Sequence, residues 1–276
     1  MSGKLYIVAT PIGNLGDITI RAVDILKSVD LVLAEDTRHS KKLFAHYEIG
    51  TSLRAFHEHN EKVKTEAIIN EINAGKSIAM ISDAGTPLIS DPGYHLVTKA
   101  KKVNIEVVPI PGPSALITAL SSSGLASNSF TFFGFLPSKP VARLKLLQTK
   151  INLDETIIFY ESPKRILSTL EDMLEVFGES REVCLAKELT KSFETILTDR
   201  LPNLIEYLDA DISHQKGEFV ILVSSADKID LIESERQLDK ILPILCSEMG
   251  ASKAAKLAAK ITGIDKKHCY KRASAL

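Results

Sequence analysis

Hydrophobic and polar positions in the first half of the chain fall into two kinds of segment. Short apolar runs bounded by Gly, Pro or charged residues are typical of buried strands, and longer stretches with apolar positions three and four apart are typical of amphipathic helices. The short runs are residues 5–9, 31–34, 77–81 and 105–110, and the longer stretches are residues 20–28, 62–73, 94–102 and 113–121. Because the two kinds alternate, the pattern predicts an α/β fold with a parallel sheet covered by helices.

The pattern changes beyond about residue 128. Strand-like runs follow at residues 130–135, 156–160, 182–186, 194–198 and 218–223, with one clear helix at residues 163–177. They predict a second α/β unit with a mixed sheet. A polar, acidic joint over residues 224–235 then leads to three short helices, at residues 238–249, 252–262 and 266–273, which resemble a helix-turn-helix module. We therefore predict three domains, over residues 1–122, 123–226 and 236–276.

Charge is distributed unevenly along the 276 residues. The 34 basic and 35 acidic residues nearly cancel, but the last 41 residues hold nine Lys or Arg against three acids, so the tail is basic and the rest acidic. Phosphate contacts dominate nucleic-acid affinity, so this asymmetry favours an anionic partner for the tail. Lys253, Lys256 and Lys260 recur at helical spacing on one face. A solvated helix face is the alternative interpretation.

The cysteines and the apolar runs indicate a cytoplasmic chain. Cys184, Cys246 and Cys269 are odd in number and lack C-x-x-C spacing, which is typical of reduced thiols. The apolar run at residues 5–9 is too short for a signal peptide. The long uncharged stretch at residues 107–138 is interrupted by proline and glycine, so we do not expect it to span a membrane.

Three loops rich in Gly, Pro and small hydroxyl residues follow predicted strands of the first domain, at residues 10–17, 82–93 and 111–115. Ligands of open α/β sheets bind at this carboxyl edge, and such loops let the backbone approach a ligand closely. Each loop alone could be a plain turn. The chain lacks a G-x-G-x-x-G fingerprint, a P-loop and a G-x-S-x-G elbow, which argues against dinucleotide binding, phosphoryl transfer and serine hydrolysis.

Nine ordered motifs resemble those of one known family. They are TPIGNLGDI (10–18), AEDTR (34–38), FHEHN (56–60), SDAGTPLISDPG (82–93), PGPSA (111–115), GFLP (134–137), FYESPKR (159–165), AKELT (186–190) and KGEF (216–219). Together they resemble the ribosomal RNA small-subunit methyltransferase I family, which belongs to the tetrapyrrole-methylase-like, or class III, methyltransferases. The resemblance runs from Leu5 to about Val223 and continues more weakly into the tail.

The resemblance implies transfer of a methyl group from S-adenosylmethionine to the 2′-hydroxyl of a cytidine ribose in the decoding region of small-subunit ribosomal RNA. It also implies a homodimer, and two α/β domains that form a cleft for the methyl donor. Carried onto matching positions, the donor contacts are Pro11, Asp83, Gly85, Thr86, Ile89, Ser114, Ala115, Tyr160, Leu189, Gly217 and Glu218.

The chemistry of these positions is suitable for the donor. Thr86 and Ser114 can bond its carboxylate and amine, and the helix predicted to begin near Pro113 points its positive end towards an anion. Tyr160 can stack on adenine or face the sulfonium cation. The alternative for Tyr160 is an aromatic side chain in the core of a strand.

A ribose hydroxyl is a poor nucleophile, so a general base or a cation that stabilises the alkoxide would help the reaction. We select Glu35, Asp36, Arg38 and Lys187 as catalytic candidates, from a wider set that includes Glu58, Asp83 and Glu161. The alternative for residues 35–38 is a helix N-terminus with a capping acid and a surface ion pair.

The remaining basic and imidazole side chains are candidates for RNA contacts. They are His57, Lys164, Arg165, Lys253, Lys256 and Lys260. We predict no metal site, because the H-x-H at residues 57–59 has no clear third ligand. Two other functions stay open, a methylase of corrin or porphyrin precursors and a non-catalytic RNA-binding assembly factor. The basic tail and the motifs at residues 56–60 and 159–165 argue against the first.

Overall fold

The structure, a computed structural model, describes residues 3–226 and 228–276. The chain forms two compact units. Unit 1 contains Met1–Thr118 together with Glu188–Glu194, and unit 2 contains Ala119–Lys187 and Thr195–Leu276.

Unit 1 is built around a five-stranded parallel sheet in the order β3-β2-β4-β1-β5. Its elements, in chain order, are β1 (Leu5–Val8), the 3-10 helix η1 (Leu15–Asp17), α1 (Ile20–Ser28), β2 (Leu31–Ala34), α2 (Thr37–His46), β3 (Leu53–Ala55), α3 (Glu58–Asn73), β4 (Ile78–Ile81), α4 (Tyr94–Lys102) and β5 (Val107–Ile110). Helix α5 (Ala115–Ser122) follows β5.

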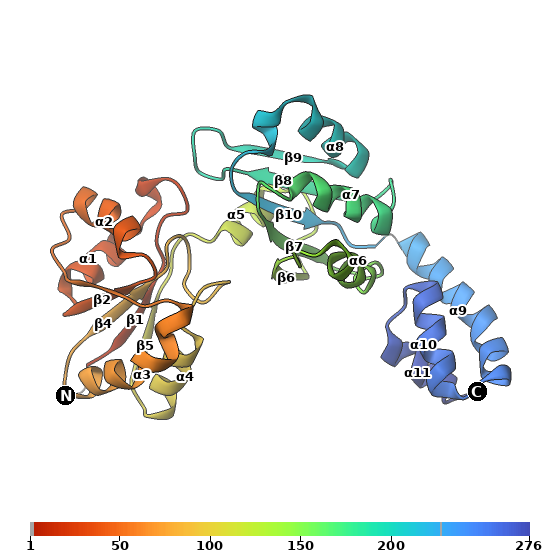
Figure 1. The fold of residues 1–276 in the computed structure, drawn as a ribbon, viewed down its shortest axis with the longest axis horizontal. Helices are drawn as coiled ribbons and strands as arrows, with labels where there is room; N and C mark the ends of the chain where they lie inside the picture. Colours follow the sequence, from red (N-terminus) through yellow and green to blue (C-terminus); the bar gives the residue numbers. More distant parts are fainter. Residues whose placement is uncertain (1–2, 227) are drawn as a thin grey trace. The chain divides into compact units, whose positions relative to one another are not determined.

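Helices cover both faces of this sheet (Figure 1). In β2, Val32 and Ala34 pack with α1 and α2 on one face, and Leu31 and Leu33 pack with α3 and α4 on the other. Both sets are buried because successive side chains of a strand point to opposite faces. This explains why the sequence shows continuous apolar runs, as expected for a parallel sheet covered on both sides.

Unit 2 contains a mixed five-stranded sheet in the order β6-β7-β10-β8-β9, in which only β6 and β7 pair in parallel. Its elements are β6 (Phe130–Phe135), α6 (Pro140–Gln148), β7 (Thr156–Glu161), α7 (Ile166–Phe177), β8 (Glu182–Lys187), β9 (Thr195–Arg200), α8 (Leu201–Ala210), the 3-10 helix η2 (Ile212–Gln215) and β10 (Phe219–Val223). Apolar side chains of α6, α7 and α8 form one core with the facing side chains of the sheet.

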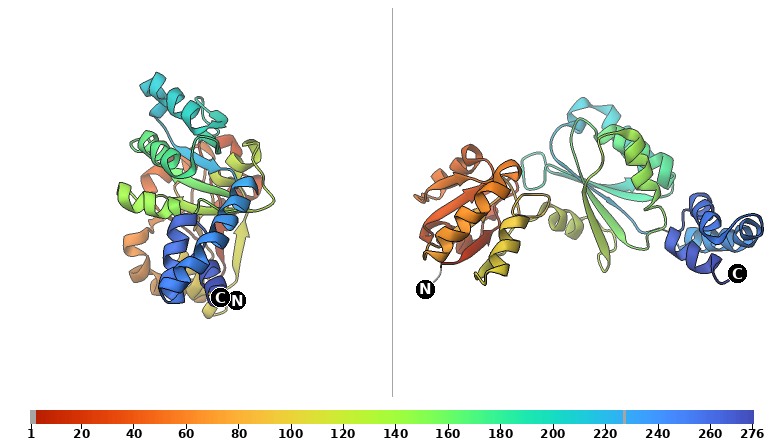
Figure 2. Two further views of the ribbon diagram at one scale, coloured as in Figure 1. Left: turned by 90° about the vertical axis from the view of Figure 1, so that its right-hand side faces the viewer. Right: turned by 60° about the horizontal axis from the view of Figure 1, so that its bottom comes forward.

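Three helices complete unit 2, namely α9 (Lys228–Glu248), α10 (Ala251–Thr262) and α11 (Lys266–Ala273). They pack against one another around Leu238, Leu242, Ala258 and Cys269 (Figure 2). The predicted polar joint at residues 224–235 is wrong in extent, since α9 already begins at Lys228 and is a long helix rather than a short one. Residue 227 of that joint lies outside the described residues.

The predicted fold class is confirmed: the protein is α/β, with a parallel sheet, a mixed sheet and a C-terminal helical module. The sequence patterns missed β3, α2, α6 and α8. Strand β3 has three residues, all half-buried, and α2 is strongly polar, so neither produces a clear apolar pattern. Within the described residues, no helix is both long and apolar enough to cross a membrane.

Candidate functional site

Three loops at the carboxyl edge of the unit 1 sheet are joined into one framework. They follow β1, β4 and β5, which are neighbours in the sheet (Figure 1). Thr10 and Gly85 exchange two backbone hydrogen bonds of 2.9 and 3.0 Å. The Thr86 hydroxyl donates to the Pro113 carbonyl over 2.9 Å. The loops at residues 10–17, 82–93 and 111–115 therefore lie together, as the sheet topology requires.

The backbones of this framework approach one another closely. A Cβ atom on Gly112 would lie 2.9 Å from the Ala9 Cβ, and Gly85 has φ of +76°. Both positions favour glycine. The Thr86 hydroxyl donates its proton to the Pro113 carbonyl. Its oxygen can therefore only accept a further hydrogen bond, for example from an ammonium group.

The sequence predicted a helix from Pro113, but α5 begins at Ala115. The Ser114 carbonyl accepts the hydrogen bond from the Thr118 N–H, so Ser114 precedes the first turn. The first backbone N–H groups of a helix have no partner within the helix. The amides that follow Ser114 are therefore donors at the sheet edge on which the other two loops lie.

A segment from the loop between β8 and β9 also belongs to unit 1. Residues Glu188–Glu194 pack there, and the Thr190 hydroxyl accepts a 3.1 Å hydrogen bond from the Asn14 N–H. A Cβ atom on Gly13 would lie 2.5 Å from the Lys191 Cγ, so the fit is tight. The buried Leu189 is thereby brought to the loop at residues 10–17, although 176 positions separate Asn14 from Thr190 along the chain.

Four carboxylates gather at the carboxyl ends of β2 and β4. The Asp83 Oδ1 accepts a 2.9 Å hydrogen bond from the Asp36 N–H. Burial, followed by repulsion from Asp91 and Asp83, raises the pKa of Glu35. Burial and repulsion from Asp83 outweigh a hydrogen bond from Ser82 and raise the pKa of Asp91 to about 6. Glu35 therefore binds a proton more tightly than an exposed glutamate, which is the direction that favours a proton acceptor.

Asp36 is adjacent to Glu35, but its pKa is shifted in the opposite direction. Its carboxylate caps α2 by accepting from the Arg38 N–H and forms two further hydrogen bonds to the Arg38 guanidinium, at 2.8 and 3.1 Å. These bonds hold the pKa of Asp36 well below its usual range. Asp36 is therefore the capping acid at the start of α2 that the alternative interpretation of residues 35–38 predicted. Because its pKa is low, it is a weak base. Arg38 is 88% exposed and can also contact an anion.

His57 lies at the carboxyl edge of the same sheet, after β3. It follows Phe56, whose N–H donates to the Ala34 carbonyl and so extends the β2–β3 pairing by one residue. Because Ala34 pairs with Ala55, Phe56 lies opposite Glu35, and His57 follows at the level of Asp36. The His57 Nε2 lies 2.8 Å from the Asn60 Nδ2.

In unit 2, the antiparallel register brings several predicted residues to one edge of the sheet. Phe219 of β10 lies opposite both Glu161 of β7 and Lys187 of β8. Tyr160 is therefore near the start of β10, which Gly217 and Glu218 precede. The ring of Tyr160 packs edge-on against Phe132 and Phe135. Its predicted core role and its predicted ligand role both remain compatible with this half-buried position.

The two charged candidates of this edge already have partners. The buried Lys187 donates to the Ser213 carbonyl over 2.7 Å. Arg165 donates two hydrogen bonds, of 2.9 and 2.6 Å, to the Oε1 of the fully buried Glu161. Because removing one partner of a buried pair is strongly destabilising, Arg165 has a structural role whatever else it contacts. Lys164 is exposed in the turn before α7.

The predicted lysines of the tail lie on the exposed face of α10. Lys253, Lys256 and Lys260 are exposed, and Ala254 and Ala258 on the opposite face are buried in the helical module. The nearby Arg272 of α11 forms ion pairs with Glu235 and Asp239 of α9. The ion pairs of Arg272 therefore link α11 to α9. The three lysines of α10 form the basic surface of the helical module.

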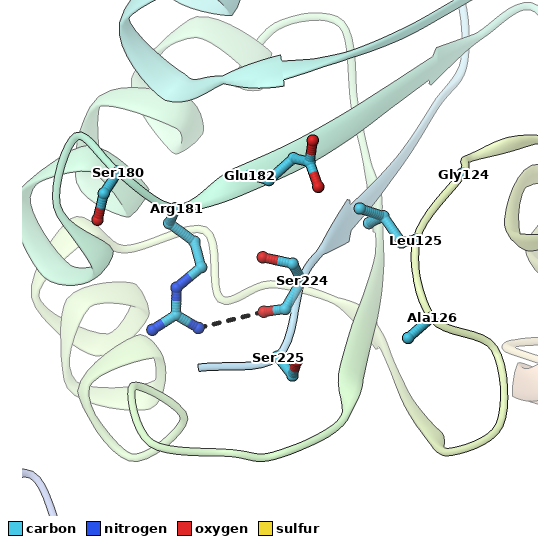
Figure 3. Close-up of a pocket in the computed structure, with 8 residues that line it drawn as sticks. All are labelled: Gly124, Leu125, Ala126, Ser180, Arg181, Glu182, Ser224 and Ser225. Atoms are coloured by element: carbon cyan, nitrogen blue, oxygen red, sulfur yellow. Dashed lines mark hydrogen bonds between the residues drawn. The ribbon is translucent and has the colours of Figure 1, made fainter. Parts of the chain in front are cut away.

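A polar pocket of about 260 Å³ lies elsewhere in unit 2, lined by residues 124–126, 180–182 and 224–225 (Figure 3). Its cation, the buried Arg181, donates to the Ser224 and Ile151 carbonyls over 3.1 and 2.9 Å. None of the predicted site residues lines it. These contacts explain Arg181 as a structural residue, and we assign no ligand to this pocket.

Three residues that the sequence analysis did not select also shape the unit 1 site. Asp91 takes part in the carboxylate group, Asn60 bonds His57, and the buried Glu61 caps α4 by accepting from the N–H groups of Gly93 and His95. Asn60 and Asp91 lie inside motifs that the sequence analysis recognised, but nothing local distinguishes them from loop residues. In the described part of the chain, no group of three or more His, Cys, Asp or Glu could hold a metal ion.

Comparison with known proteins identifies the family. Residues 4–205 match the family Tetrapyrrole (Corrin/Porphyrin) Methylases, and residues 232–276 match the RsmI C-terminal HTH domain. The chain is 51% identical, over 267 residues, to a Vibrio cholerae protein named Ribosomal RNA small subunit methyltransferase I, with 97% of this chain and 93% of the relative covered. The chain belongs to the ribosomal RNA small subunit methyltransferase I family.

A second relative supports this family, and a solved structure shows the same fold. The Escherichia coli O157:H7 protein of the same name is 48% identical over 273 residues, with 98% of this chain and 94% of the relative covered. A crystal structure of diphthine synthase aligns with a TM-score of 0.62 at 14% identity, covering 81% of this chain and 90% of that one. That likeness concerns the fold. The resemblance to the methyltransferase I family in the sequence motifs is confirmed.

Proposed function

We propose that the chain methylates the 2′-hydroxyl of a cytidine ribose in the decoding region of the small-subunit 16S ribosomal RNA. As a member of its family it is an S-adenosylmethionine-dependent methyltransferase of ribosomal RNA. The observation that carries the proposal is the near-complete coverage of relatives with this name, which includes the C-terminal helical module. The nucleotide and the 2′-oxygen come from the resemblance of the sequence motifs.

The loop framework of unit 1 is suited to hold the methyl donor. Its backbones pack so closely that a Cβ atom on Gly112 would clash with Ala9, and it presents the first amides of α5 and the Thr86 oxygen. Such groups can bind an amino-acid carboxylate and ammonium. We assign the donor to the following unit 1 residues: Pro11, Asp83, Gly85, Thr86, Ile89, Ser114, Ala115 and Leu189. Tyr160, Gly217 and Glu218 of unit 2 are assigned to it on resemblance alone.

The bound donor supplies an electrophilic methyl group on a positively charged sulfur. The protein must hold the ribose hydroxyl in line with that methyl group, exclude water and accept the hydroxyl proton. Among the catalytic candidates of unit 1, Glu35 suits proton acceptance because burial and neighbouring carboxylates raise its pKa. Asp36 positions Arg38, whose exposed guanidinium is available to an RNA phosphate. We retain Lys187 as a cation for the developing alkoxide.

RNA contacts are assigned to side chains of both units. His57 is placed at the carboxyl edge of unit 1, and Lys164 and Arg165 precede α7 in unit 2. Lys253, Lys256 and Lys260 form the basic surface of the helical module. The Arg165 guanidinium is bonded to Glu161 and is 23% exposed, so an RNA contact would use its exposed part.

Three further features follow from the proposed activity and from the family. Residues 1–122 and 123–226 act as the two α/β domains that bind the donor, and residues 236–276 act as the RNA-binding domain. The chain works as a homodimer. It acts in the cytoplasm, where small ribosomal subunits are found.

The decisive experiment incubates the purified protein with methyl-labelled S-adenosylmethionine and undermethylated small ribosomal subunits. Nuclease digestion and mass spectrometry then locate the label. Label on one 2′-O-methylcytidine is the expected result. Label on a base, or on a porphyrinoid precursor offered in parallel, would contradict the proposed reaction.

A further inference from the structure

An exposed aromatic side chain ends the edge strand of the unit 2 sheet. Phe135 is the last residue of β6, which is the first strand in the order β6-β7-β10-β8-β9, and the residue is 57% exposed. The proposed function has so far given it no role. A single exposed apolar side chain is common on protein surfaces, so its geometry and its neighbours decide whether it binds anything.

A bulge in β6 turns this ring towards Tyr160. Successive side chains of a strand point to opposite faces, so a regular strand would place Phe135 on the face of Phe133, which packs against the helix-covered core. The pairing of β6 with β7 is instead shifted between Phe132 and Phe135, and Gly134 in this stretch has φ of +68°. The extra residue brings Phe135 to the face of Phe132 and Tyr160. Bulges next to active sites commonly redirect a side chain in this way.

The Phe135 ring is supported but not covered. Its centroid lies 5.7 Å from that of Tyr160 at an interplanar angle of 65°, and Tyr160 meets Phe132 at 4.8 Å and 64°. This edge-to-face geometry is favourable for aromatic pairs. One such contact covers at most one face of a ring, and Phe135 is more than half exposed. The ring therefore keeps a face that a planar ligand can stack on.

Lysines lie at the same edge of the sheet as this ring. Because β6 and β7 are parallel neighbours, the segments that follow them lie at one edge. Lys139 precedes α6, Lys164 precedes α7, and both are exposed. The carboxylate of Glu161 at this edge is fully buried and paired with Arg165, so it does not offset the lysine charges. Glu218 precedes β10, which lies on the opposite side of β7 from β6.

An aromatic face bordered by lysines is suited to single-stranded RNA. Unstacked bases stack on aromatic side chains, and lysines contact the neighbouring phosphates. As a ribosomal RNA methyltransferase, the chain has RNA as its substrate. A second copy of the chain docked through the same patch would bring its own lysines against Lys139 and Lys164, which repulsion between like charges opposes.

We propose that Phe135 stacks on an unpaired base of the ribosomal RNA, with Lys139 and Lys164 contacting the adjoining phosphates. This inference deepens the proposed function and rests on it for the identity of the RNA. A base inside a duplex has no free face, so the contact selects a nucleotide that has left its stack. Because Phe135 contacts Tyr160, the stacked base would lie next to a residue assigned to the methyl donor.

Stacking can be observed directly by fluorescence. The chain contains no tryptophan, so Phe135→Trp places a single indole ring at the site. A short oligocytidylate should quench its fluorescence, whereas heparin, an anionic polymer without bases, should not. Phe130→Trp is the matched control at the other end of β6, where Phe130 is 39% exposed, and it should not respond. Absence of quenching, equal quenching by heparin, or quenching by S-adenosylmethionine alone overturns the proposal.

Steady-state kinetics with small subunits test the contribution of the contact. Phe135→Ala removes the stacking face, so KM for subunits should rise roughly 5 to 100-fold while KM for S-adenosylmethionine stays unchanged. Phe135→Tyr keeps an aromatic face and should remain within about 3-fold of wild type. Phe135→Leu is apolar but has no aromatic face, so it should resemble Phe135→Ala. Phe130→Ala is the control and should leave both KM values unchanged.

The other outcomes separate this site from the proposed function. A wild-type KM in Phe135→Leu would indicate an ordinary apolar contact, and a changed mass of Phe135→Ala in sedimentation would assign the ring to a contact between two copies; both overturn the proposal. If the wild-type chain methylates no subunits but oligocytidylate still quenches Phe135→Trp, the proposed function fails and the base contact stands. If wild type methylates subunits and Phe135→Ala has unchanged KM values, the function stands and the base contact fails.

Discussion

Neighbouring carboxylates in this protein have different proton affinities because their partners differ. Glu35 is partly buried among other acids, whereas Asp36 is bonded to the end of a helix and to Arg38. Adjacent positions in the sequence therefore give one candidate base and one structural acid. The sequence identified both residues as candidates but could not rank them, because the ranking depends on Asp83 and Asp91, which lie about 50 positions further along the chain.

Substitution can separate the two roles. Glu35→Gln preserves size but cannot accept a proton, so kcat should fall about 10² to 10⁴-fold with little change in either KM. Asp36→Asn retains a favourable helix cap, so its kcat should fall far less. Single-turnover rates on small subunits measure the difference. Equal losses in the two variants would contradict the assignment of Glu35 as the base.

The rate should also depend on pH in a defined direction. A proton acceptor works only in its ionised form, and the pKa of Glu35 is raised, so kcat should decrease as the pH falls through that pKa. The measurement is kcat between about pH 5 and 9, on subunits that remain intact over this range. A kcat that does not fall towards the acid end of this range in wild type, or that falls in the same way in Glu35→Gln, would contradict Glu35 as the proton acceptor.

Asp91 links the site to stability. Its pKa is about 6 in the folded protein against 3.8 in the unfolded chain, so the folded state is favoured below about pH 4 and loses that advantage as the pH rises through 6. Asp91→Asn should therefore be more stable than wild type at pH 8, by about 1–2 kcal/mol after allowance for solvent screening. The gain should shrink through pH 6 and vanish near pH 4.

Urea denaturation at several pH values measures this effect. Asp199→Asn is a control of opposite sign, because hydrogen bonds from Arg200 and Asn203 lower the pKa of that exposed carboxyl. A stability gain for Asp91→Asn that is independent of pH would show that the pKa of this carboxyl is the same in the folded and unfolded states, which contradicts the prediction.

At the scale of elements, sequence patterns predicted the strands better than the loops. Helix α1, strands β2 and β6 and helix α11 lie at the predicted residues, because each has a strong apolar pattern or a clear cap. The sequence patterns gave no indication that residues 188–194 pack in unit 1. That placement depends on contacts with Asn14 and Gly13, and such long-range contacts leave no local pattern.

The fit of residues 188–194 against the loop after β1 can be tested at Gly13. A Cβ atom there would lie 2.8 Å from the Thr190 Oγ1 and 3.0 Å from the Leu189 carbonyl oxygen. Gly13→Ala should displace the segment that carries Leu189 and weaken S-adenosylmethionine binding roughly 10 to 100-fold, in line with overpacking costs of about 1–3 kcal/mol. Isothermal titration calorimetry measures the affinity.

Gly50→Ala is the matched control, because a Cβ atom on Gly50 would contact nothing within 4 Å. It should bind S-adenosylmethionine as wild type does. If Gly13→Ala binds equally well, the segment at residues 188–194 does not contribute to the donor site.

At the scale of the whole molecule, composition predicted the basic tail but not how its charges are used. The tail holds nine Lys or Arg, and of these Arg272 is engaged with Glu235 and Asp239 in ion pairs that join α11 to α9. Exposure of the α10 lysines could be inferred from their helical spacing, whereas the ion pairs required the packing of three helices. The charges available to RNA are therefore fewer than the sequence count suggests.

The α10 lysines can be tested through the salt dependence of binding. Each phosphate contact contributes about 0.7–0.9 to the slope of log affinity against log salt concentration. Replacing Lys253, Lys256 and Lys260 together with Gln should therefore reduce that slope by about 2–3 for small subunits, with the rate of saturated enzyme unchanged because α10 is outside the proposed reaction. Replacing Lys27, Lys101 and Lys102, which are exposed in unit 1, provides a control with the same charge change. Equal slopes for the two triple variants would mean that the α10 lysines act only through the net charge of the protein. An unchanged slope in the α10 variant would mean that these lysines do not contact RNA.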